Sequence, residues 1–147
     1  MPRESLRFGR ATRRWGVAIA LLLYASGAGW LALHRWGQTA SEFGPQPRPA
    51  ETWLLRTHGA AAMAALILLG ALLPLHVIRG LRAGSNRSTG WVMLVACALL
   101  VASGYALYYA GAPSLREGAV WCHDVLGLAL PLLLAAHIWC GRQSGGR

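Results

Sequence analysis

The sequence predicts an all-α integral membrane protein, a four-helix bundle, and three observations lead to this class. Of the 147 residues, 55% are hydrophobic and 13% are charged, whereas about a quarter of the residues in a soluble domain are charged. The hydrophobic residues gather in four blocks, each close to the roughly 20 residues that a helix needs to cross a bilayer. Tryptophans stand near the ends of these blocks, as in the aromatic belt of membrane proteins: Trp15, Trp36, Trp53, Trp91, Trp121 and Trp139.

The first two helices are expected over residues 15–35 and 57–80. Arg14 and Arg35 bracket the first charge-free stretch, and Arg56 and Arg79 bracket the second. The twin arginine ahead of the first stretch, with small residues inside it, would also suit a cleaved signal peptide. Because the apolar run continues unbroken through residues 30–33, a retained membrane anchor is the favoured interpretation, with cleavage as the alternative.

The third and fourth helices are expected over residues 90–111 and 121–141. Arg87 and Arg116 bracket the third apolar stretch, and the fourth holds Asp124 as its only charge. A buried helix of a soluble protein is seldom this long and this apolar on every face. Residues 1–147 are therefore expected to form a single membrane domain.

Arginine sets the expected orientation. Ten arginines flank the helices on one side and four on the other, and the positive-inside rule puts the richer side in the cytoplasm. We therefore expect a multi-pass protein of the bacterial cytoplasmic membrane with both termini in the cytoplasm. The net charge of +9 then reflects topology and anionic lipid, and no nucleic acid is expected as a partner. The cytoplasmic set is Arg3, Arg7, Arg10, Arg13, Arg14, Arg79, Arg82, Arg87, Arg142 and Arg147.

The histidines are the residues that most clearly indicate a function, because ionisable side chains are costly in a bilayer and usually mark a functional site. His58 and His76 stand at positions i and i+18 of the second helix, and His123 and His137 at i and i+14 of the fourth. On an ideal α-helix, a step of i+18 makes about five turns with no net rotation, and a step of i+14 leaves about 40°. The second and fourth helices run in the same direction. We therefore expect an outer pair, His58 with His123, and an inner pair, His76 with His137.

Two facing imidazoles at each level favour haem b as the cofactor. A zinc site would need three or four ligands, with Cys or carboxylate among them, whereas a porphyrin fills four positions around iron and leaves two for imidazole. Helix bundles commonly hold such cofactors between facing helices. Without a Cys-x-x-Cys-His motif, covalent attachment is not expected. Two haem b groups are predicted, with His34 as an alternative to His58 and no catalytic residue. The predicted iron ligands are His58, His76, His123 and His137.

This layout resembles the bacterial di-haem cytochromes b. The spacing of His123 and His137, the facing histidines on the second helix and the segment SGYALYY at 103–109 are similar to cytochrome b561-type proteins and to the cytochrome b subunits of formate dehydrogenases and nickel–iron hydrogenases. The resemblance covers residues 54–141, although the i, i+18 spacing on the second helix departs from the pattern. It implies an electron-transfer subunit rather than a free-standing enzyme, with quinone or a partner oxidoreductase or cytochrome subunit. The alternative is a small membrane transporter or sensor that uses intramembrane histidine for protons or a metal ion.

Overall fold

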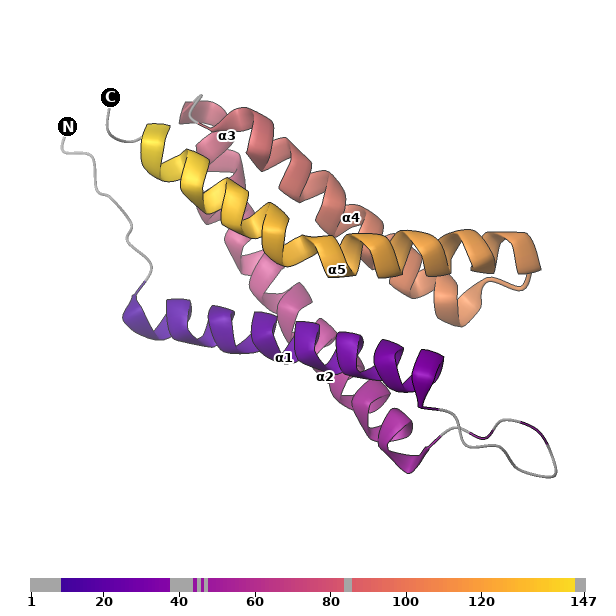
Figure 1. Ribbon diagram of the computed structural model, residues 1–147. Helices are drawn as coiled ribbons and strands as arrows, with labels where there is room; N and C mark the ends of the chain where they lie inside the picture. Colours follow the sequence, from indigo (N-terminus) through magenta and orange to yellow (C-terminus); the bar gives the residue numbers. More distant parts are fainter. Residues whose placement is uncertain (1–8, 38–43, 45, 47, 84–85, 145–147) are drawn as a thin grey trace. The chain divides into compact units, whose positions relative to one another are not determined.

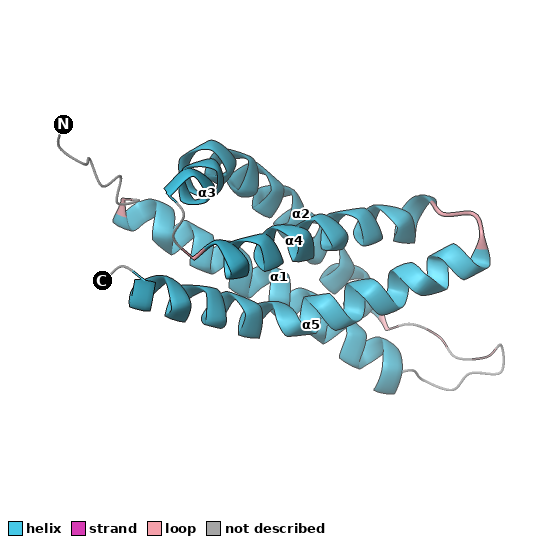
Figure 2. Ribbon diagram, turned by 90° about the horizontal axis from the view of Figure 1, so that it is seen from above, coloured by secondary structure: helices cyan, strands magenta, loops and turns pink. Residues whose placement is uncertain are grey.

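The computed structural model describes residues 9–37, 44, 46, 48–83 and 86–144, and each element in these ranges is helical (Figure 2). Within these ranges, four helices are long and apolar enough to cross a membrane, so the predicted all-α class of a multi-pass membrane protein is confirmed. Arg3, Arg7 and Arg147 of the orientation argument lie outside the described residues. The elements are α1 (Arg10–Trp36), α2 (Pro49–Leu72), the π-helical segment η1 (Leu73–Ile78), α3 (Arg79–Ala83), α4 (Arg87–Tyr109) and α5 (Pro113–Ser144) (Figure 1).

The helices are longer than predicted at most of their ends. α1 begins at Arg10 instead of residue 15, α2 at Pro49 instead of residue 57, and α5 at Pro113 instead of residue 121. α4 spans Arg87–Tyr109 instead of 90–111, and α5 continues to Ser144 instead of 141. The predicted bounds followed the apolar stretches alone, whereas a helix can continue through polar residues once it leaves the hydrocarbon.

The chain divides into two compact units, Met1–Ala71 and Leu72–Arg147. The first contains α1 and all of α2 except its last residue, Leu72, and the second contains η1, α3, α4 and α5. Each unit is described by itself below.

Pro49 and Glu51 fix the start of α2 in the first unit. Proline at the first helical position has a suitable φ and no N–H to leave unpaired. The Glu51 carboxylate accepts a hydrogen bond from the Arg48 N–H at 3.2 Å, which is one half of a capping box. Its other oxygen lies 3.1 Å from His34 Nδ1 on α1. Since a buried carboxylate needs such partners, and the Glu51 side chain is only 4% exposed, this residue ties the end of α1 to the start of α2.

Glycines of α1 bring the two helices of the first unit close together. A Cβ built on Gly16 would lie 3.4 Å from Leu68, and one built on Gly29 would lie 3.5 Å from Leu54. These contacts run in opposite order along the two helices, so α1 and α2 are antiparallel. Small residues allow this approach between membrane helices.

In the second unit, α4 and α5 lie side by side and run in opposite directions (Figures 1 and 2). Pro113 begins α5, where its missing N–H costs no hydrogen bond. α5 changes direction partway along its length (Figure 1). Pro131 lies inside the helix and removes one backbone hydrogen bond there, which is a common cause of a kink.

Proline also explains η1. The ring of Pro74 has no N–H to donate and would clash with the carbonyl one turn earlier in a regular α-helix. The chain widens into a π-helical turn over Leu73–Ile78, a geometry that recurs at functional sites. His76 lies inside this turn.

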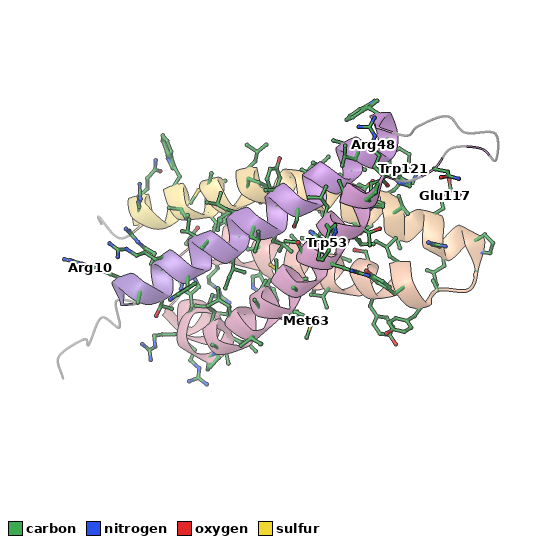
Figure 3. All side chains as sticks on the ribbon, turned by 90° about the horizontal axis from the view of Figure 1, so that it is seen from below. Arg10, Arg48, Trp53, Met63, Glu117 and Trp121 are labelled. Atoms are coloured by element: carbon green, nitrogen blue, oxygen red, sulfur yellow. The ribbon has the colours of Figure 1, made fainter. Side chains whose placement is uncertain are left out.

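The outer surfaces of the helices are apolar. Trp53 and Met63 on α2 and Trp121 on α5 are exposed (Figure 3). Apolar side chains in such numbers on the outside suit a lipid environment, which identifies the bilayer as the medium that surrounds the protein.

Replacing Glu51 with alanine is expected to lower the free energy of unfolding by about 1.5–3 kcal/mol, the usual contribution of hydrogen bonds to a charged group. Glu51→Gln keeps an acceptor for the Arg48 N–H, so the free energy of unfolding should fall less in this variant. Circular dichroism during titration of the detergent-solubilised protein with sodium dodecyl sulfate measures both variants. Equal stability of Glu51→Ala and the native chain would contradict the link between α1 and α2.

Candidate functional site

His76 and His137, the expected inner pair, are neighbours in the second unit. His76 lies in η1 and His137 lies on α5. Their ring centroids are 6.0 Å apart, and the ring planes stand at 87° to each other. Two imidazoles from separate helices therefore meet at one place.

Two residues at the start of α4, Thr89 and the N-cap residue Asn86, contact His137. Its Nδ1 lies 2.9 Å from Thr89 Oγ1, and the Thr89 hydroxyl donates to Asn86 Oδ1. The Asn86 amide donates to the backbone oxygen of His137 at 3.0 Å. The amide nitrogen is also 3.4 Å from His137 Nδ1, but an amide N–H makes no hydrogen bond to a protonated ring nitrogen. Because the single Thr89 proton is used on Asn86, the Thr89 oxygen accepts from His137 Nδ1–H. The lone pair of the neutral ring then lies on Nε2.

His123 on α5 is held in the same way at the other end of α4. Its Nδ1 lies 3.1 Å from Ser103 Oγ, and the Ser103 hydroxyl donates to the Leu100 oxygen at 3.2 Å. With the hydroxyl proton on Leu100, the Ser103 oxygen accepts from His123 Nδ1–H. In that arrangement the lone pair of this ring again lies on Nε2.

His58 on α2 repeats the arrangement in the first unit. Its Nδ1 lies 3.0 Å from the Leu23 backbone oxygen, which can only accept, so Nδ1 carries the proton. Ser26 Oγ is 3.4 Å from the same nitrogen and donates its own proton to the Leu22 oxygen at 2.6 Å. Ser26 is buried, and it lies against the ring from α1.

A glycine follows each of these three hydroxyl residues and packs against the same ring. A Cβ on Gly27 would lie 2.8 Å from His58 Cε1, one on Gly104 would lie 3.3 Å from His123 Cε1, and one on Gly90 would lie 4.0 Å from His137 Cε1. We call the three dipeptides the hydroxyl–glycine pairs: Ser26-Gly27, Thr89-Gly90 and Ser103-Gly104.

Our sequence reasoning did not identify the hydroxyl–glycine pairs as contacts of the histidines. For two of these pairs, the spacing of residues in the sequence could have indicated the contact. Thr89 and Ser103 stand at positions i and i+14 of α4, the same separation as that of His123 and His137 on α5. In two neighbouring antiparallel helices, equal separations let each hydroxyl contact one ring: Thr89 contacts His137, and Ser103 contacts His123.

The predicted alignment of His58 and His76 assumed an uninterrupted α-helix, and that assumption is wrong. The wider turn of η1 begins at Leu73 and changes the rotation of the residues that follow it. His58 and His123, the expected outer pair, belong to different units. The structure describes His58 against α1 and His123 against α4.

His34 is engaged at the end of α1. Besides its contact with Glu51, its ring stacks on Trp30 with centroids 4.6 Å apart and planes at 12°. These contacts give His34 a structural role in joining α1 to α2. The choice between His58 and His34 as the outer ligand stays a prediction.

A metal ion at His76 and His137 would need further ligands. Within the described ranges, no group of three or more His, Cys, Asp or Glu could hold a metal ion by itself. A porphyrin supplies four in-plane nitrogens, so it is a group that two imidazoles can complete.

Comparisons with protein-family models, with curated proteins and with solved structures give no match to this chain. The resemblance to di-haem cytochromes b therefore stays a prediction.

Alanine at the three glycines is expected to have graded effects on stability. Alanine in a helix is about 0.8–1.0 kcal/mol more favourable than glycine, but at Gly27 the new methyl group would push His58 off its hydrogen bond to Leu23. We expect Gly27→Ala to lower the thermal unfolding midpoint most, Gly104→Ala to lower it less, and Gly90→Ala to leave it unchanged or raised. The three midpoints are measured in one detergent. A Gly27→Ala variant as stable as Gly90→Ala would show that this close contact is not required.

Proposed function

We propose that this chain is a b-type cytochrome of the bacterial cytoplasmic membrane, with both termini in the cytoplasm, that carries electrons across the membrane through two haem b groups. His76 and His137 would hold the inner haem. The pairing of His58 with His123 at the outer haem stays a prediction from the sequence. The single observation that carries the proposal is the meeting of His76 and His137.

The separation of these two rings would let both imidazoles hold one haem iron. Metal–imidazole bonds of about 2 Å to both rings would put the ring centres roughly 6 Å apart. The separation in the structure is 6.0 Å, with the ring planes at 87° to each other.

The hydrogen bonds of the rings suit the same role. A histidine that binds a metal through one nitrogen usually donates the other N–H to a nearby oxygen, which fixes the tautomer and the ring orientation. His137, His123 and His58 each donate Nδ1–H to an oxygen on the neighbouring helix. The lone pair of each ring is thereby presented by Nε2.

Bound haem would supply one-electron exchange between ferric and ferrous iron. The residues of the chain hold the imidazoles, and the apolar helices exclude water. Arg79 and Arg142 lie close in sequence to His76 and His137 and could pair with haem propionates through charge-assisted hydrogen bonds. The proposal assigns no catalytic residue, so substrate chemistry would belong to quinone or to a partner oxidoreductase or cytochrome subunit.

The native chain, purified in detergent from cells with ample haem, is expected to bind two haem b groups, counted by pyridine haemochrome absorbance against protein. Replacing both members of one pair, as in H76A/H137A or H58A/H123A, should leave one haem. Replacing one member of each pair, as in H58A/H76A, should weaken both sites. His34→Ala is the matched control, and this variant should still bind two haem groups.

A native preparation without a b-type spectrum would overturn the proposal. A colourless protein whose proton or metal binding depends on single histidines would support the transporter or sensor alternative instead. Loss of both haems in H76A/H137A would overturn the assignment of the inner pair.

A further inference from the structure

We infer that the hydroxyl–glycine pairs are positioning elements that set how strongly the histidines donate electron density, and so set the midpoint potentials of the two haems. This inference rests on the proposed function. It adds positioning residues that touch the ligands rather than the iron: Ser26, Asn86, Thr89 and Ser103.

Each hydroxyl gives its own proton to an oxygen other than the ring. Ser26 donates to Leu22 O and Ser103 to Leu100 O, while Thr89 donates to Asn86. With their protons placed there, the oxygens of Thr89 and Ser103 accept from His137 and His123. At His58 the acceptor is the Leu23 backbone oxygen at 3.0 Å, and Ser26 Oγ lies beside it at 3.4 Å from Nδ1. In this arrangement all three rings carry the proton on Nδ1 and present Nε2 as the ligand atom.

One register of α4 against α5 serves two of the rings. The i, i+14 separation of Thr89 and Ser103 equals that of His123 and His137, and the glycine after each hydroxyl faces the same ring as the hydroxyl. A slip of one residue along α4 would break both contacts together. α4 is therefore the helix that positions both ligand rings of α5.

The hydrogen bonds around His137 form a closed ring. His137 Nδ1–H donates to Thr89, Thr89 donates to Asn86, and the Asn86 amide donates back to the His137 backbone oxygen. Asn86 has a φ of 51°, in the left-handed region that asparagine tolerates better than most residues. Gly141 leaves room for its amide, since a Cβ there would lie 3.3 Å from Asn86 Nδ2.

These bonds have an electronic consequence. A hydroxyl that gives its own proton away is a stronger acceptor, and a stronger acceptor at Nδ1–H makes the ligating nitrogen more basic. A more basic ligand stabilises ferric iron and lowers the midpoint potential, which second-shell hydrogen bonds are known to control. Removing the hydroxyl should therefore raise the potential of the haem that the ring binds.

The test is a potentiometric titration of haem absorbance in the full-length protein. Thr89→Val, which keeps the shape and removes the hydroxyl, is expected to raise the potential of one haem, and Ser103→Ala that of the other. Outer-shell partners of metal ligands typically change affinity or activity by about 10–100-fold. A tenfold change in the one-electron reduction equilibrium corresponds to about 59 mV. Thr89→Ser and Ser103→Thr keep the hydroxyl and should restore native potentials.

Ser88→Ala is the matched control, because Ser88 is the exposed neighbour of Thr89 and should change neither potential. If Thr89→Val loses a haem and Thr89→Ser retains it, the hydroxyl requirement is supported. If both variants lose it, or if Thr89→Val and Ser103→Ala bind two haems at native potentials, the inference is overturned while the proposed function stands. A native chain without haem overturns the proposed function itself.

Discussion

The hydrogen bond between a histidine Nδ1–H and an oxygen on the neighbouring helix is the contact on which the arrangement of this protein depends. A polar group in a bilayer has no water to bond and must find its partner within the protein. His137 bonds Thr89, His123 bonds Ser103, and His58 bonds Leu23. Each bond joins two helices of one unit, so the same contact that satisfies the ring also fixes the register of the helix pair.

Several local features of the chain allow the histidine rings to reach the positions in which they make these hydrogen bonds. Glycine beside each hydroxyl lets the ring approach the opposite backbone, most closely at Gly27. Pro74 replaces a regular turn by the wider turn of η1, which carries His76 to the ring of His137. Packing, tautomer and the meeting of two imidazoles therefore follow from a few small residues and one proline, placed on helices that are otherwise apolar.

The four spans could be predicted from the sequence because the bilayer fixes both the length and the composition of a crossing helix. The helix ends could not be predicted in the same way, since helices such as α5 continue through charged residues beyond the hydrocarbon. The histidines stood out because ionisable residues are rare in such spans. Their partners Thr89 and Ser103 did not stand out, because small and hydroxyl residues are common in membrane helices. Only the register of Thr89 and Ser103 against α5 distinguishes these two residues from the others. The π-helical turn at Pro74 could not be predicted, because a helical wheel assumes a constant turn.

The central proposal is that His76 and His137 would hold one haem iron, and the electron paramagnetic resonance spectrum of the oxidised protein tests it most directly. Axial imidazole planes near the observed 87° predict a low-spin ferric signal of large anisotropy, with a high maximum g value, that disappears in the H76A/H137A double variant. A spectrum containing only the rhombic signals of near-parallel imidazoles would contradict the claim. A large-anisotropy signal that persists unchanged in H76A/H137A would contradict it as well.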